Sequence, residues 1–141
     1  MSLANLANLV KTNQLKIESF EQTEFNGLIK SGKISLKDAN NTTLQLENRF
    51  LLAYKAAHSF ALAALRWHGY RSTNRYTVFQ VLPNTLGVGM EVWRILAKCH
   101  ALRNVAEYEG YFEIDEQLLG DLLTATHVLL ERVTSLAIHT P

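Results

Sequence analysis

The feature that most constrains the fold is a segment at about residues 44–68 with two adjacent apolar stripes at helical spacing. Side chains three or four positions apart share one face of an α-helix, so each stripe marks a surface to be buried. A helix with two such surfaces packs against neighbours on more than one side, and its alanines permit their close approach. We expect Gly69 to end it. The stripes are Leu44, Glu47, Leu51, Tyr54, His58, Ala61 and Leu65, and Phe50, Ala53, Ala57, Phe60 and Ala64.

The N-terminal third also favours helices, because helix formers dominate the chain and only two prolines occur in it. Short helices are expected over residues 2–12 and 21–31, the second one stopping at Gly32. Ser35 is expected to cap a new helical segment. The NNTT sequence at 40–43 either interrupts that segment or lies within it.

Beyond the central helix, the sequence predicts a polar loop, a shorter helix that Pro83 makes irregular, and two long helices, the last one capped by Asp115. These segments cover residues 70–76, 77–87, 90–109 and 116–137. The predicted fold class is therefore all-α: a bundle of about four main helices with short N-terminal helices. We expect residues 1–141 to form one domain, divided into the N-terminal helices at 1–34 and the bundle at 35–138.

Cysteine content and hydropathy exclude several classes of protein. Cys99 is the only cysteine, so an internal disulfide is impossible and no CxxC zinc motif exists. We expect no metal and no cofactor. The N-terminus lacks the layout of a signal peptide, and no run of about 18 apolar residues occurs, so we expect a cytoplasmic chain that does not span a membrane. The motifs GxSxG, GxGxxG and GxxxxGK[ST] are also absent.

Charge is distributed unevenly although the net charge is only +1. Residues 48–90 contain five bases and no acid, whereas residues 104–131 contain seven acids and neither lysine nor arginine. One interpretation is that the two segments are neighbours with complementary charges, within a chain or across a dimer. The other is that the basic segment forms a surface for a polyanion.

The stretch CHALRNVAEYEG at 99–110 concentrates polar side chains on a predicted helix. His100, Arg103 and Glu107 share one stripe, and Asn104 and Tyr108 flank it. His100 can reach Asn104, and Arg103 can reach Glu107, each one turn away. The stripe is either a functional site or the solvent-exposed face of a helix, stabilised by an Arg103–Glu107 ion pair.

The sequence RNVAEYEGY at 103–111, after a long helix with small apolar residues, resembles the motif region of HEPN-domain proteins. That family comprises helical bundles, commonly homodimeric, many of which carry an Arg, a polar residue and then a His four to six residues later. Arg103 and Asn104 match this pattern, but Tyr108 stands where the His would fall. Because tyrosine has a reference pKa near 10, Tyr108 is a poor general base at neutral pH.

The resemblance implies two related activities. If the chain cleaves RNA without a metal, Arg103 would hold the phosphate, and Tyr108 or Tyr111 would stack on a base or donate a hydrogen bond. His100 precedes the Arg and is no part of the family pattern, but on the same stripe it could replace the missing His as base or acid. Relatives also act as toxins neutralised by a nucleotidyltransferase partner, or as the substrate-binding companion of such an enzyme.

Two other groups of residues are candidates for the same cleft. The stretch RWHGYRSTNRY at 66–76 alternates cations with aromatics, and Arg71 and Arg75 would lie in its loop. His58 follows one turn after Tyr54 on the central helix, where it either fills the core or faces Arg103. The residues expected to contact a ligand in this cleft are Asn104, Glu107, Tyr111, His58, Arg71 and Arg75.

Three functions stay open. The favoured one is a binding module that recognises RNA, a nucleotide or a protein partner, such as a nucleotidyltransferase, through a cleft around Arg103. The alternative is a metal-independent ribonuclease or a toxin-like protein that cleaves RNA. The third is a structural protein whose homodimer is its function. An open cleft that joins Arg103 and His100 would favour the first two, whereas an Arg103 occupied by acids would favour the third.

Overall fold

The computed structural model describes residues 3–110, 112–139 and 141, and the side chains from residue 5 on. Within these residues the chain is mostly helical, with one two-stranded sheet. The elements in chain order are α1 (Leu3–Lys11), β1 (Lys16–Ile17), α2 (Gln22–Ala39), α3 (Leu46–Trp67), β2 (Tyr70–Arg71), α4 (Arg75–Gln80), α5 (Leu82–Thr85), α6 (Met90–Glu109) and α7 (Glu116–Ala137).

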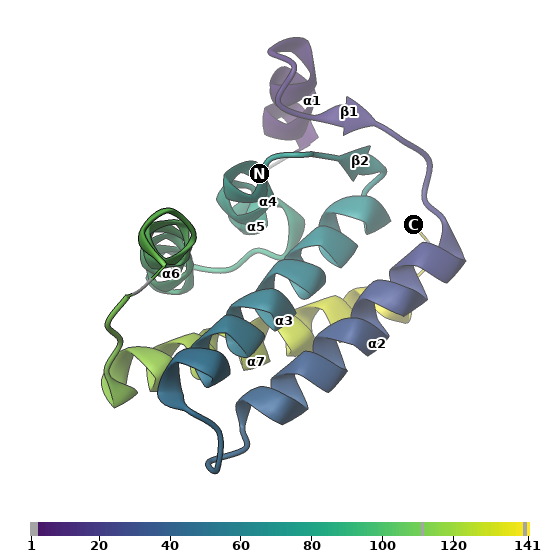
Figure 1. Ribbon diagram of the computed structural model, residues 1–141. Coiled ribbons are helices and arrows are strands. Elements are labelled where there is room, and N and C mark those ends of the chain that lie inside the picture. The colour runs from purple at the N-terminus through teal and green to yellow at the C-terminus, as the bar shows by residue number, and fades with distance from the viewer. Residues whose placement is uncertain (1–2, 111, 140) are drawn as a thin grey trace.

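The central helix α3 lies between α2 and α7, and these three long helices form the main layer of the molecule (Figure 1). The alanines of α3, together with Phe50 and Phe60, are fully buried, as the two predicted stripes require. Two leucines of the first stripe are different: Leu51 is 39% exposed, and Leu44 is 36% exposed and precedes α3. The expectation of a helix packed on more than one side is therefore confirmed, although the surface of α3 at Leu51 is exposed to solvent.

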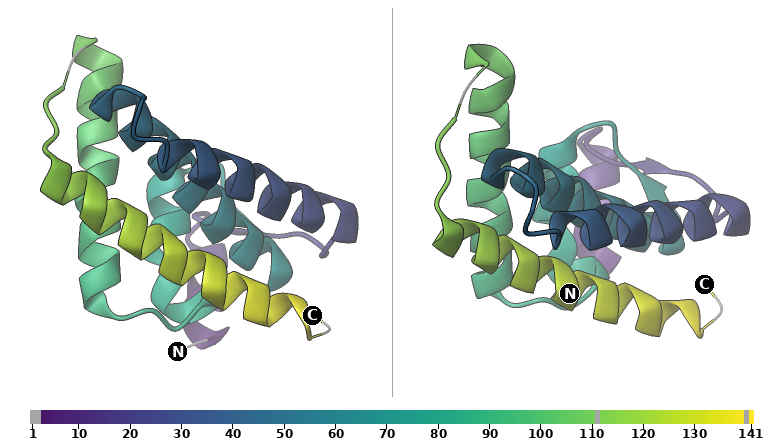
Figure 2. Two further views of the ribbon diagram at one scale, coloured as in Figure 1. Left: turned by 90° about the horizontal axis from the view of Figure 1, so that it is seen from below. Right: turned by 60° about the horizontal axis from the view of Figure 1, so that its bottom comes forward.

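Helix α6 stands across this layer, and the short helices α4 and α5 lie beside it, with α4 in contact with both α3 and α6 (Figures 1 and 2). Only Leu96 and Cys99 of α6 are fully buried, because its C-terminal end projects beyond the other helices (Figure 2). Gly110 ends α6 in the left-handed conformation (φ 74°) that favours glycine.

The N-terminal residues cover the end of α3. Strand β1 pairs antiparallel with β2, with Lys16 opposite Arg71 and Ile17 opposite Tyr70. Leu6 of α1 and Leu15 join the buried core. The N-terminal part of the chain is thus attached to the segment that directly follows α3 (Figure 1).

The predicted helix end at Gly32 and the predicted cap at Ser35 are wrong, because α2 continues through both residues to Ala39. Gly32 is buried in the interior of α2, where a Cβ atom would lie 2.4 Å from Cε1 of Phe60. The glycine therefore makes room for an aromatic ring of α3 and does not end the helix. The helix also crosses the expected division between residues 34 and 35, and NNTT separates α2 from α3.

The predicted loop at 70–76 and the single helix at 77–87 are also partly wrong. Residues 70–71 form β2, and α4 begins at Arg75 because the Asn74 side chain accepts hydrogen bonds from the backbone of Tyr76 and Thr77. The helix is divided in two, with Pro83 in the first turn of α5, where its missing N–H has no effect.

The predicted bounds of α6 and α7 are confirmed, and Asp115 caps α7 by accepting a hydrogen bond from the backbone of Leu118 at 2.8 Å. In the described part of the chain, no helix combines the length and apolarity that crossing a bilayer requires.

Candidate functional site

A groove of about 350 Å³ opens where α3, α4 and α6 meet. Helix α3 contributes four successive positions of one face, α4 contributes its first residue, and α6 contributes one residue of the polar stripe. The lining residues are Leu51, Tyr54, Lys55, His58, Arg75 and Arg103. Three of these six side chains are cations, and none is a carboxylate.

Arg103 is held at the groove by two contacts. Its guanidinium carbon lies 5.7 Å from the centre of the Tyr54 ring, a cation–π distance, and its Nη2 lies 2.7 Å from the Glu107 carboxylate. Arg103 is only 20% exposed, whereas Glu107 is 56% exposed. An exposed ion pair between residues one helical turn apart is weak. Glu107 therefore orients Arg103 but leaves it able to bind a more highly charged anion.

A row of polar contacts leads from α6 into the groove. The Nδ2 amide of Asn104 lies 3.2 Å from Nε2 of His100, and Nδ1 of His100 lies 2.9 Å from the Tyr54 hydroxyl. The positive charges of Arg103 and Arg75 also act on that hydroxyl. His100 thus stands directly behind the groove wall and positions Tyr54, which faces the groove.

The two imidazoles of the site are neutral at pH 7. Burial lowers the pKa of His58 to about 4, helped by the positive charges of Arg75 and Arg103. Burial and the same two arginines lower the pKa of His100. Burial also raises the pKa of Tyr54, which therefore keeps its proton. The site combines three fixed positive charges with neutral groups that can form hydrogen bonds.

The structure brings together most of the residues that the sequence singled out. Arg103, Arg75 and His58 line the groove, and His100 and Asn104 support it from behind. Glu107 pairs with Arg103. Tyr108 is different: it is 91% exposed and does not line the groove, so the structure does not place it with the other candidates. Tyr111 lies outside the described residues.

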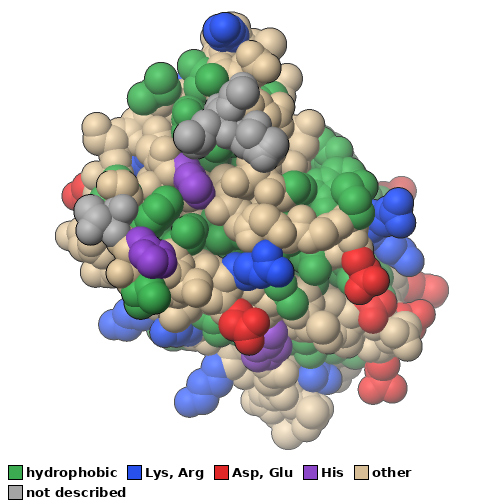
Figure 3. All heavy atoms as spheres, turned by 180° about the vertical axis from the view of Figure 1, so that it is seen from behind, with side chains coloured by type: hydrophobic (Ala, Val, Ile, Leu, Met, Phe, Trp, Pro, Cys, Tyr) green, Lys and Arg blue, Asp and Glu red, His purple; other side chains and the backbone are tan. Residues whose placement is uncertain are grey.

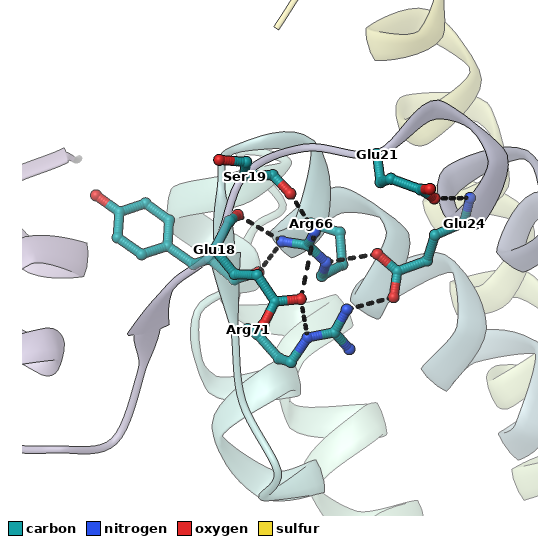
Figure 4. A network of polar contacts seen from close by, with 7 residues as sticks. Glu18, Ser19, Glu21, Glu24, Arg66 and Arg71 are labelled. Atoms are coloured by element: carbon teal, nitrogen blue, oxygen red, sulfur yellow. Dashed lines mark hydrogen bonds and ion pairs between the residues drawn. The ribbon is translucent and has the colours of Figure 1, made fainter.

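Arg71 is not at the groove, which corrects its place among the candidate ligand contacts. It pairs with Glu18 at 2.7 Å and with Glu24, beside Arg66, which is 1% exposed and donates to the Glu24 carboxylate at 2.7 Å (Figure 4). Arg66 also donates to backbone carbonyls of Glu18, Ser19 and Tyr70. Most cations of the 66–76 stretch therefore stabilise the fold.

The same contacts decide how the basic segment is neutralised. Arg66 and Arg71 of this segment form ion pairs with Glu18 and Glu24 in the N-terminal part. Arg49 donates to the backbone carbonyl of Ala39 at 2.8 Å. Two of the five bases of residues 48–90 are therefore neutralised by the N-terminal part of the chain.

Tyr54 and Lys55 are site residues that the sequence interpretation missed. The sequence periodicity places Tyr54 in the apolar stripe, although Tyr54 stands one turn before His58. Lys55 stands one turn after Leu51, and both residues line the groove. The available signal was this spacing, which placed a phenol, an imidazole and an amine on neighbouring positions of one helix. Cys99 is no nucleophile, because burial raises the pKa of its thiol to about 12.

Comparisons of the chain with protein-family models, with curated proteins and with solved structures give no significant match.

Proposed function

We propose that the chain is a HEPN-like binding module that recognises a phosphate of RNA or of a nucleotide through the groove around Arg103. The observation that supports the proposal best is the convergence of Lys55, Arg75 and Arg103 from three helices on one small groove. Guanidinium groups bind phosphate oxygens through paired hydrogen bonds, and an ammonium group adds a point charge. The neutral Tyr54 and His58 supply further hydrogen bonds.

Binding is favoured over cleavage because of the protonation states. Cleavage through the 2′-hydroxyl needs a base and an acid on opposite sides of the phosphate. His58, with its pKa of about 4, and His100, with its lowered pKa, are both unprotonated at pH 7, so neither imidazole is ready to protonate the leaving oxygen. The site supports a bound phosphate better than it supports the complete reaction.

The purely structural alternative has less support, since Arg103 both pairs with Glu107 and lines the groove. Assembly is part of the proposal: a homodimer, with a nucleotidyltransferase-type protein as a further partner. The exposed Val105 and Tyr108 on the projecting end of α6 offer apolar surface for such contacts. Sedimentation velocity would measure the mass, and a monomer at micromolar concentration would contradict the dimer.

The test of the binding function uses fluorescence anisotropy with a labelled single-stranded RNA, and competition by unlabelled nucleotides. We expect Arg103→Ala and Arg75→Ala to weaken binding at least about tenfold, since each removes a charge-assisted contact. Arg94→Ala is the matched control, because Arg94 is an exposed arginine on α6 that does not line the groove.

The same samples, incubated in the presence of EDTA, test cleavage. Arg103-dependent loss of full-length RNA would establish the metal-independent ribonuclease instead. If neither binding nor cleavage depended on Arg103 while all variants kept the helical circular dichroism of the unchanged chain, the proposed function would be wrong.

A further inference from the structure

We infer that the groove selects a phosphomonoester, such as the terminal phosphate of one nucleotide, over the internal phosphodiester of a nucleic-acid strand. The inference rests on the proposed phosphate-binding function and makes it specific. It follows from the charge of the groove, from its size and from the surface around it.

The charge of the groove favours a ligand with two negative charges. Arg103 has a carboxylate partner in Glu107, but Lys55 and Arg75 have no ion pair with a carboxylate in the parts of the chain that are described. Two positive charges at one groove are therefore left for the ligand. A phosphomonoester carries about −1.5 to −2 charges at neutral pH, whereas an internal phosphodiester carries only about one. The monoester matches the two cations.

The volume of the groove suits a small ligand. The groove holds about 350 Å³, which is near the lower end of the roughly 300–1,000 Å³ typical of sites for small ligands. Proteins that hold single strands instead follow the backbone with a long cationic groove and several stacking rings. The six residues that line this groove come from three short lengths of helix and give room for one phosphate and its neighbouring atoms.

The other arginines of the basic segment do not extend the groove into a cationic path for a strand. The other arginines of the basic segment are already used: Arg66 and Arg71 by Glu18 and Glu24, and Arg49 by a backbone carbonyl. On the face seen in Figure 3, positive and negative side chains are interspersed, without a large area of one sign. Of the five bases at residues 48–90, Lys55 and Arg75 are therefore those without a carboxylate or backbone-carbonyl partner among the described residues, and both line the groove.

One aromatic side chain lies where a nucleotide could extend. Tyr76 follows Arg75 on α4, is 40% exposed, and has its ring centre 5.8 Å from that of His100 behind the groove wall. An exposed ring beside a phosphate site provides a surface on which a base can stack. The expected ligand is therefore a nucleotide whose terminal phosphate enters the groove.

The experiment compares adenosine 5′-monophosphate, 3′,5′-cyclic adenosine monophosphate, adenosine and inorganic phosphate by isothermal titration calorimetry at pH 7.5. The first two share a base and a sugar but differ in phosphate charge. We expect the monophosphate to bind at least about tenfold more tightly than the cyclic diester, because the extra negative charge interacts with Lys55 and Arg75 at short range. Inorganic phosphate tests whether the base and sugar contribute.

A second arm uses two eight-nucleotide RNAs of one sequence, with and without a 5′-phosphate, to distinguish a free nucleotide from the end of a strand as the source of the monoester. Lys55→Gln should reduce the preference for the monophosphate over the cyclic diester, and Lys98→Gln, an exposed lysine on α6 away from the groove, should leave it unchanged.

The outcomes separate the inference from the proposed function. Equal affinity for the monophosphate and the cyclic diester, with both lost in Arg103→Ala, would overturn the preference for a monoester and keep phosphate binding. RNA that binds tightly regardless of its terminal phosphate would do the same. Absence of any binding that depends on Arg103, in variants with unchanged circular dichroism, would overturn both.

Discussion

At the scale of single residues, the character of the groove depends on imidazoles that stay neutral among cations. His58 lies in the groove with Arg75 and Arg103, and burial together with these charges opposes its protonation. A protonated His58 would add a fourth positive charge to a small, partly buried space. The neutral form instead offers one donor and one acceptor, so the arginines and Lys55 alone set the charge of the groove.

The lowered pKa of His58 predicts that folding stability decreases in mild acid. In the unfolded chain the imidazole has its ordinary pKa near 6.5, so between about pH 6.5 and 4 the unfolded state binds a proton that the folded state does not. Stability is therefore full above the unfolded pKa and falls as the pH decreases. From pH 7 to pH 5 we expect a loss of about 2 kcal/mol in the free energy of unfolding from this residue.

Urea unfolding of the unchanged chain and of His58→Phe at the two pH values measures this effect. The variant should lose less stability on acidification, because phenylalanine does not titrate, although His100 continues to contribute in the same direction. His127→Phe, an exposed histidine on α7, is the control. An equal loss in the unchanged chain and in His58→Phe would contradict the neutral His58.

At the scale of elements, α2 contains two glycines in opposite surroundings. A Cβ atom at Gly27 would meet nothing within 4 Å, whereas one at Gly32 would lie 2.4 Å from the Phe60 ring, which is fully buried. Close packing of α2 on α3 therefore depends on the absence of a side chain at one position only.

This contrast predicts opposite effects of the same substitution. Gly32→Ala should lower the free energy of unfolding by about 1–3 kcal/mol, because Phe60 has no free space into which to move. Gly27→Ala should raise it by about 0.5–1 kcal/mol, since alanine favours the helix. Thermal and urea unfolding of both variants measures the two changes, and a stabilising Gly32→Ala would show that α2 and α3 are not packed closely there.

The elements also show what the sequence could predict. The periodicity of α3, the polar stripe and bounds of α6, and the Asp115 cap of α7 are local signals, and the structure confirms them. Gly32 misled the prediction because its role is to fit Phe60, a residue 28 positions away that no local pattern connects to it. The predicted end of α2 was wrong for that reason.

The candidate site was predictable to a similar extent. Arg103, His100, Asn104 and Glu107 share one helix, so their contacts follow from spacing along α6. The position of Tyr54 and Lys55 opposite Arg103 depends on how α3 packs against α6, which spacing does not define. Likewise, the basic character of Arg71 was visible, but its pairing with Glu18 and Glu24 requires the tertiary fold.

At the scale of the whole molecule, four charged side chains attach the N-terminal part to the rest of the chain. Arg66 lies in the last turn of α3, and Arg71 lies in β2, which follows it. Glu18 and Glu24 lie about fifty residues earlier in the chain (Figure 4). The contacts of Arg66 satisfy its guanidinium almost completely, which makes burial of that charge acceptable. The pKa of Glu24 is lowered, although burial opposes this, because Arg71 and Arg66 both donate to its carboxylate.

Removing the buried cation should destabilise the fold strongly. We expect Arg66→Met to lower the free energy of unfolding by about 3–5 kcal/mol, since it leaves three backbone carbonyls without their donor and Glu24 with Arg71 as its remaining cation. Arg71→Met should cost less, because Arg71 is 28% exposed and water replaces its contacts. Urea unfolding gives both values, and a smaller loss for Arg66 than for Arg71 would contradict this assignment.

The attachment of β1 to β2 and of Glu18 to Arg71 also sets an order of events while the protein is being made. The N-terminal residues leave the ribosome first, but their anchoring arginines are translated 42 to 53 positions later. At about 5–20 residues per second, this delay lasts roughly 2–10 s. During that time Leu6 and Leu15, which are buried in the finished fold, have no core to join. A nascent chain stalled before residue 71 would therefore present them to chaperones and proteases, and one stalled well beyond it would not.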